Sequence, residues 1–133
     1  MKNIIETVIE AGNFKTLIKV LHEAGLVDIF SSDGPYTIFA PTDEAFLKLP
    51  TGTIEGLIHD KEKLTNLLTN HVIPKELLAK NVVNEHKIKT INGKNIKIKA
   101  GKNVKIDNAN LITTDIKCKN GVIHVIDEVL IIN

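Results

Sequence analysis

One change in hydrophobic periodicity, near residue 86, constrains the fold of this chain more than any other feature. Upstream of it, apolar residues recur at helical spacing, most clearly over residues 14–21. Downstream, polar and apolar residues alternate over 87–91 and 95–99, as is typical of half-buried strands. Because the helices come first and the strands last, the 133 residues are predicted to form a single α+β domain and not a series of βαβ units.

Proline and capping signals mark the ends of several elements. Residues 36–40 form a short β-prone segment that stops at Pro41. Thr42 is expected to have a structural role as the N-cap of a helix that begins at Asp43. Asn13 is predicted to cap the helix of residues 14–24 in the same way.

Two Asn-Gly pairs predict β-hairpins in the second half of the chain, one at 92–93 and one at 120–121. If residues 120 and 121 form the turn, Cys118 faces Ile123 on the neighbouring strand. Alternation then puts Cys118 and His124 on opposite faces of the sheet, which argues against a cysteine–histidine catalytic pair. His124 is therefore expected to be structural.

The same register places Asp127 on the apolar face of the sheet, opposite Thr114. A buried carboxylate without partners is costly, so Asp127 is expected to accept a hydrogen bond from a hydroxyl or a backbone N–H. We assign it a structural role.

Composition limits the classes of protein to which the chain can belong. One cysteine excludes an intrachain disulfide, and no apolar run approaches the ~18 residues of a membrane span. Glu6 and Glu10 interrupt the first apolar stretch, which is unlike the core of a signal peptide. The sequence as it stands therefore predicts either a cytoplasmic protein or the mature part of a longer precursor.

Three segments in order resemble the fasciclin domain in its compact prokaryotic form. GPYTIFAPTDEAF at 34–46 is similar to the first signature box of that family, and NGVIHVIDEVL at 120–130 to the second. NHVIP at 70–74 lies where the family usually carries a Tyr-His pair. The resemblance implies a wedge-shaped β-sandwich with several helices in the N-terminal half. It also implies a non-enzymatic adhesion or interaction role outside the cell or at its surface.

The resemblance points to two candidate contact sites. Asn70 and His71 match the region linked to receptor binding in animal members, although Asn70 replaces the tyrosine. The alternative for His71 is a buried, hydrogen-bonded side chain at a helix–strand junction. Asp115 and Ile116 match an integrin-recognition pair, and the alternative for them is an exposed edge-strand Asp beside a buried Ile.

A lysine cluster supplies a third candidate that does not depend on the family. Residues 87–106 hold seven of the 17 basic residues, all lysine, and no acid; they include Lys87, Lys89, Lys97 and Lys99. Such a cluster can attract an anionic polysaccharide, a phospholipid surface or nucleic acid. The absence of arginine and of interleaved aromatic residues disfavours nucleic acid. The alternative is a solvated face whose lysines discourage edge-to-edge strand pairing.

The sequence gives little support to catalysis or to cofactor binding. It contains no Gly-rich phosphate loop and no G-x-S-x-G motif, and its five histidines lack metal-site spacing. We therefore predict no enzyme activity, no cofactor and no metal.

Two hypotheses about function remain. The first is an extracellular or cell-surface adhesion module, monomeric or weakly oligomeric, that binds a matrix or surface protein or an anionic polysaccharide. The second is a small-ligand or lipid-binding domain that uses a cleft between helices and sheet.

Overall fold

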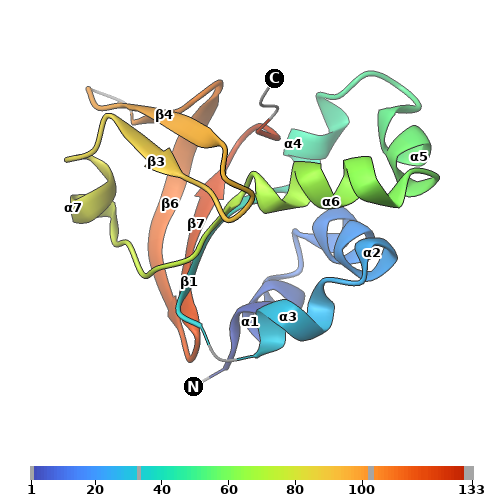
Figure 1. Ribbon diagram of the computed structural model, residues 1–133, viewed down its shortest axis with the longest axis horizontal. Helices are drawn as coiled ribbons and strands as arrows, with labels where there is room; N and C mark the ends of the chain where they lie inside the picture. Colours follow the sequence, from blue (N-terminus) through green and yellow to red (C-terminus); the bar gives the residue numbers. More distant parts are fainter. Residues whose placement is uncertain (1, 33, 102–103, 131–133) are drawn as a thin grey trace.

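The computed structural model describes residues 2–32, 34–101 and 104–130. Figure 1 shows helices α1–α6 on one side of strands β1, β6 and β7, and strands β3 and β4 with helix α7 on the other. The helices are α1 (Ile4–Ala11), α2 (Lys15–Ala24), α3 (Val27–Ser31), α4 (Asp43–Leu47), α5 (Thr53–Ile58), α6 (Lys61–Thr69) and α7 (Ala79–Val82). The strands are β1 (Tyr36–Pro41), β2 (Val72–Ile73), β3 (Lys87–Lys89), β4 (Asn95–Lys99), β5 (Lys105–Ile106), β6 (Ala109–Cys118) and β7 (Gly121–Ile126). The predicted α+β class is confirmed.

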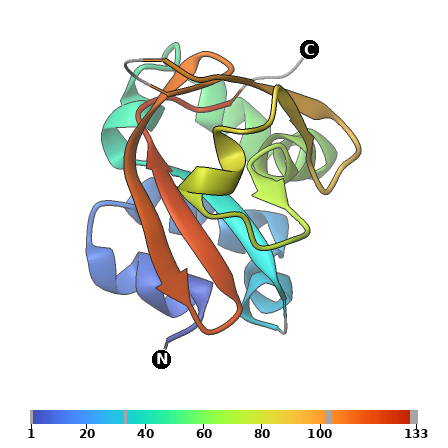
Figure 2. The same cartoon turned by 90° about the vertical axis from the view of Figure 1, so that its left-hand side faces the viewer.

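The strands form one seven-stranded sheet in the order β2-β1-β7-β6-β5-β4-β3. The first signature segment supplies β1 and the second supplies β7, and these two strands pair in parallel next to the edge strand β2. The β3–β4 hairpin returns toward β2, where the backbone N–H of Ile91 donates to the carbonyl of Val72 at 2.8 Å. The sheet therefore curls over itself, as the turned view in Figure 2 shows.

This curl creates two cores. The first lies between helices α1–α6 and one face of the sheet, and includes Phe30 and Leu64. The second lies between strands β1, β2, β6 and β7 and strands β3–β5. It includes Phe39 and four buried isoleucines of β3, β4 and β5. The alternating sequence of the second half thus buries one set of side chains and exposes the other.

The capping prediction is confirmed at Thr42, whose hydroxyl accepts the N–H of Ala45 at 3.2 Å. It is wrong at Asn13, because α2 begins one residue later than expected, after Phe14. A residue distant in sequence caps this helix instead: Asp43 Oδ1 accepts the N–H of Thr16 at 2.8 Å. The N–H of Asp43 in turn donates to the carbonyl of Asn13 at 3.0 Å. Helices α2 and α4 therefore fix each other's first turns.

The predicted register of the last hairpin is wrong by two residues in its pairing. Cys118 pairs with Gly121 and Lys117 with Val122, so Lys119 and Asn120 form the turn. A shift of two leaves Cys118, Ile116 and the residues of β7 on their predicted faces, but the register shifts between Leu111 and Ile116 put Thr113, and not Thr114, on the face of Val125. Cys118 accordingly lies in the first core, while His124 stacks against Phe39 of the second with ring centroids 5.6 Å apart.

Candidate functional site

The lysine cluster becomes one exposed face of strands β3, β4 and β5. We call it the lysine face and define it as Lys87, Lys89, Lys97, Lys99 and Lys105; Lys102 lies outside the described residues. All five side chains are exposed, and the intervening isoleucines point into the second core. The sheet thus separates charge from apolar surface by alternation alone.

Strand register brings these lysines together in pairs. Lys87 lies directly opposite Lys97, and Lys99 lies directly opposite Lys105. Among the described residues, none of the five has a carboxylate within salt-bridge distance. The carboxylate of Asp107, beside Lys97, instead accepts the backbone N–H of Lys97 at 2.9 Å. Like charges placed opposite each other repel, so the face carries a positive potential at some cost in stability.

Asn70 and His71 are buried, with 4% and 3% of their surface exposed, in the segment that joins α6 to β2. Asn70 Oδ1 accepts from the side-chain amide of Asn92 at 2.6 Å, which ties the β3–β4 hairpin loop to the end of α6. The amide of Asn92 also reaches the carbonyl of Asn66 at 3.1 Å. The structure therefore uses Asn70 as an internal link between two elements.

The two ring nitrogens of His71 have different partners. Nδ1 lies 2.9 Å from the carbonyl of Leu67, and Nε2 accepts the N–H of Leu130 at 2.8 Å. This arrangement requires a neutral ring with its proton on Nδ1. Burial lowers the pKa of His71 to about 4, against the hydrogen bonds to Leu67 and Leu68 that favour the charged form. His71 joins α6 to the segment that follows β7 and does not present its ring at the surface.

Asp115 is exposed but its polar groups are engaged. It lies in the irregular part of β6 with a φ of 58°, a conformation that Asp tolerates better than most residues. Its Oδ1 accepts the N–H of Ala79 at 2.8 Å, and its own N–H donates to His124 Nδ1 at 3.2 Å. Ile116 is half-buried against the first core. Asp115 therefore holds the start of α7 against the sheet, while Ile116 packs on the other core.

His124 is fully buried and its Nε2 lies 2.7 Å from the carbonyl of Leu77. Because Nδ1 accepts from Asp115, the ring is neutral with its proton on Nε2. Burial lowers the pKa of His124, while the Leu77 carbonyl and the Asp115 carboxylate oppose that shift. The ring connects β7, β6 and the segment before α7.

Asp127 accepts a backbone N–H, as expected, and the donor is Asn110. The expected position opposite Thr114 is wrong, because the bulges in β6 shift the register there. The N–H and the side-chain amide of Asn110 donate to the two carboxylate oxygens at 2.7 and 3.0 Å. The pKa of Asp127 is lowered overall. Partial burial acts to raise it, but the hydrogen bonds from Asn110 and the positive charge of Lys48 favour the ionised carboxylate more strongly.

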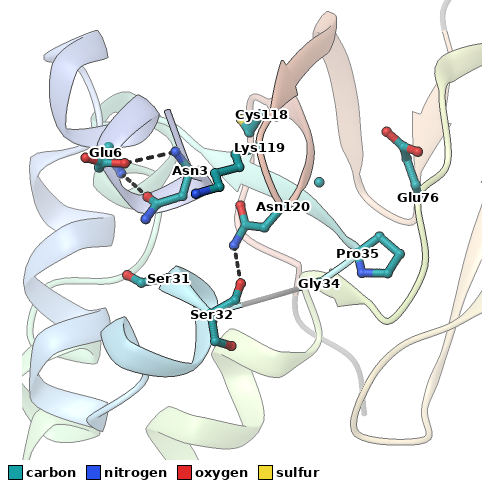
Figure 3. A pocket seen from close by; sticks show the side chains of 11 residues that line it. Asn3, Glu6, Ser31, Ser32, Gly34, Pro35, Glu76, Cys118, Lys119 and Asn120 are labelled. Carbon is teal, nitrogen blue, oxygen red and sulfur yellow. Dashed lines mark hydrogen bonds between the residues drawn. The ribbon is translucent and has the colours of Figure 1, made fainter. Parts of the chain in front are cut away.

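Sequence reasoning missed Asn120, which it treated only as a turn former. Its Oδ1 accepts the N–H of Ile4, and its amide nitrogen donates to the carbonyls of Phe30 and Ser32, at 2.8–2.9 Å. Figure 3 shows this side chain in a cleft of about 440 Å³ between α1, α3 and the β6–β7 turn. Asn3 and Glu6, beside it, cap each other. The polar groups here hold elements together.

Two kinds of feature were sought among the described residues, a metal-binding cluster and a membrane-crossing helix. No group of three or more His, Cys, Asp or Glu side chains in these residues is arranged to hold a metal ion. None of the helices in this part of the chain has the length and apolar character of a bilayer crossing. Cys118 is buried, with its Sγ 3.5 Å from the hydroxyl of Thr7, and burial raises the pKa of its thiol.

Comparison with known proteins gives consistent matches. Protein sll1735 of Synechocystis sp. is 38% identical over 98% of this chain and 98% of its own length. Protein sll1483 of the same organism is 42% identical over 94% of this chain and 73% of its own length. Transforming growth factor-beta-induced protein ig-h3 of Sus scrofa is 35% identical over 97% of this chain, which spans only 19% of that relative.

A solved structure shares the fold. It is a FAS1 domain pair from the insect cell adhesion molecule fasciclin I, with a TM-score of 0.70 and 24% identity over 91% of this chain and 46% of that one. A family model described as Fasciclin domain matches residues 12–132. The chain therefore belongs to the fasciclin domain family.

Proposed function

We propose that this domain is a non-enzymatic adhesion or interaction module, acting outside the cell or at its surface, that binds an anionic protein or polysaccharide through the lysine face. The observation that carries the proposal is the direct opposition of Lys87 to Lys97 and of Lys99 to Lys105. The similar fold of a domain pair from an insect cell adhesion molecule supports the same class of role.

The pairing of like charges favours a functional explanation of the lysine face. Lysines that only protect a sheet edge are needed on the edge strand β3, yet Lys97, Lys99 and Lys105 lie on inner strands. Lysines that lie opposite each other on inner strands lower the stability of the fold by repulsion and create a positive potential at the surface. A bound polyanion would turn this repulsion into attraction and release counterions.

The interior offers little support for the second hypothesis, a lipid or small ligand between helices and sheet. The apolar cavity between α1, α2 and β1 has a volume of about 10 Å³, and its walls include Ile5, Leu17 and Ile38. A water molecule already needs about that much space, and ligand pockets are usually hundreds of Å³. Side chains thus fill the region where an acyl chain would have to lie.

The test is retention on a sulfated-polysaccharide resin during a salt gradient. The lysine-face variant combines Lys97→Gln with Lys99→Gln. The control combines Lys15→Gln with Lys19→Gln, which removes the same charge from the exposed side of α2. We expect the first variant to elute at clearly lower salt than the wild type, and the control to elute near it. Equal elution of the two variants would contradict a specific role of the face, as would no retention of the wild type at low salt.

A further inference from the structure

Strand β3 is an edge of the sheet that is covered at one end only. The N–H of Ile91, just beyond β3, donates to the carbonyl of Val72 in β2, the strand at the opposite edge. No further backbone hydrogen bond joins β3 to β2 or to residues 74–77 among the described residues, and Pro74, directly after β2, has no N–H to donate. The two edges therefore meet once and then separate.

A groove of about 360 Å³ lies beside β3 where the edges separate. One wall is β3 itself and the other is the segment 74–77 that leads from β2 toward α7. In Figure 2 this side of the molecule faces the viewer. The groove is as large as the smaller ligand pockets of proteins. Its lining residues are Pro74, Lys75, Leu77, Glu85, Lys87, Ile88, Lys89 and Thr90.

The hydrogen-bond pattern shows which backbone groups of β3 point into the groove. The N–H of Thr90 donates to Lys94, and the carbonyl of His86 accepts from Ile98, so the even-numbered residues bond toward β4. In an antiparallel strand the alternate residues point the other way. The N–H and C=O groups of Lys87 and Lys89 therefore point away from β4, along the line on which Ile91 reaches β2.

The chemistry of the groove selects a particular kind of segment. Lys75, Lys87 and Lys89 surround it with three positive charges against one negative charge, that of Glu85. The half-buried Leu77 provides apolar surface on the opposite wall, and Ile88, between the two lysines of β3, turns its side chain into the second core. A strand that paired with β3 would place every second side chain beside the lysines and the others toward this apolar surface.

We propose that the groove binds an extended acidic peptide segment of a partner protein, which adds to β3 as an antiparallel strand, with acidic residues opposite Lys87 and Lys89 and an apolar residue between them. This inference rests on the proposed interaction role and names one class of partner for it. A polysaccharide could satisfy the lysines, but it has no alternating amide ladder to pair with the backbone of β3.

Peptides with single N-methyl changes test the backbone pairing directly. The probe is an acetylated peptide of alternating glutamate and valine, with binding followed by fluorescence anisotropy. In an antiparallel pair, residues directly opposite Lys87 and Lys89 exchange both hydrogen bonds with them. N-methylation of the glutamates should therefore weaken binding at least about tenfold, because it removes these donors, whereas N-methylation of the valines should have a small effect. Equal effects of the two modifications would overturn the proposed pairing.

Hydrogen exchange of the full chain gives a second readout. The amides of Lys87 and Lys89 should exchange at least about tenfold more slowly when the parent peptide is bound, while the amide of Lys99 should change little. Lys87→Gln combined with Lys89→Gln should weaken the peptide more than Lys97→Gln combined with Lys99→Gln does. Unchanged exchange at Lys87 and Lys89 in the peptide-bound chain would overturn the inference.

The two proposals can fail separately. Retention on the sulfated resin without peptide binding would overturn the strand-addition inference and leave the interaction role of the lysine face standing. Peptide binding with slowed exchange at Lys87 and Lys89, but no resin retention, would support strand addition and remove the polysaccharide as a partner. Failure of both assays would overturn both proposals.

Discussion

The backbone N–H of Ile4 donates a hydrogen bond to Asn120 Oδ1 at 2.9 Å, across 116 residues of chain. The amide nitrogen of the same side chain bonds to the carbonyls of Phe30 and Ser32, and the Asn120 carbonyl accepts the N–H of Tyr36 at 3.0 Å. One turn residue thus satisfies the start of α1, the end of α3 and the start of β1.

Asn120→Ala should reduce the free energy of unfolding by about 3 kcal/mol, because it leaves several polar groups without partners. Urea denaturation measures this. Asn95→Ala, at an exposed position of β4, is the control and should change stability by less than about 0.5 kcal/mol. A similar small change for Asn120→Ala would show that water replaces these hydrogen bonds at little cost.

Gly121→Ala should be more damaging than Gly93→Ala, although both glycines follow an asparagine. A Cβ at residue 121 would lie 1.9 Å from the carbonyl oxygen of Tyr36, so β1 and β7 would have to move apart. A Cβ at residue 93 has nothing within 4 Å, and only its φ of +88° opposes it. We expect losses of at least about 3 kcal/mol at 121 and about 1 kcal/mol at 93 in thermal or urea unfolding. The reverse order would contradict the close approach of the strands.

Stability should fall as the pH is lowered below about 6.5. His71 has a pKa of about 4 in the folded protein and an ordinary value of 6.5 when unfolded, so the unfolded chain binds the proton more readily. This contribution to the free energy of unfolding is complete above pH 6.5 and is lost as the pH falls from 6.5 to 4. The total loss over that range is about 3 kcal/mol. His124, whose pKa is also lowered, acts in the same direction.

Calorimetric melting between pH 7.5 and 4.5 measures this dependence. His71→Ala should lower the melting temperature at neutral pH and should make the melting temperature depend less on pH. The salt concentration at which the domain elutes from the resin should change little. An unchanged melting temperature with lost retention would mean that His71 contacts the partner after all.

Asp115→Asn and Asp115→Ala should behave differently. Asparagine can keep the bond to the Ala79 N–H and adopts the φ of 58° readily, so stability should change by less than about 0.5 kcal/mol. Alanine loses both advantages and should cost about 1–2 kcal/mol. If Asp115→Asn abolished binding to a protein partner at unchanged stability, the carboxylate charge would have a contact role beyond holding α7.

Lys97→Gln should make the domain slightly more stable while it weakens polyanion binding. It removes the repulsion with Lys87 directly opposite, a gain of about 0.5 kcal/mol at low salt that screening should reduce at 1 M salt. Lys15→Gln in α2 is the control for a general effect of net charge. A loss of stability in Lys97→Gln would imply that the lysine stem packs on its neighbours and contributes more than the charge costs.

A capping or turn residue could be predicted from the sequence only where the group that it contacts lies close by in the chain. Thr42 caps the helix it directly precedes, so sequence spacing suffices to predict it. The cap of α2 comes from Asp43, 27 residues away, and no local rule could select it over Asn13. At Gly121 the local signal was misleading, because the residue is not in the turn and its small size is required by the neighbouring strand.

The candidate site shows the same division. Alternation over 87–91 and 95–99 predicted half-buried strands, and the structure places Lys87, Lys89, Lys97 and Lys99 on their exposed side because side-chain direction in a strand has a period of two. The burial of Asn70 and His71 depends on Asn92 and Leu130, which approach only after the sheet has curled.

The sequence by itself determined the class of fold, the Thr42 cap and the separation of lysine from isoleucine along β3 and β4, since these follow from local periodicity and capping. Only the tertiary structure decided which strand edges meet, which lysines oppose each other and which buried side chains are already engaged. Those properties depend on register and on contacts between distant segments, and a shift of two residues in register changes every partner while leaving the sequence pattern equally satisfied.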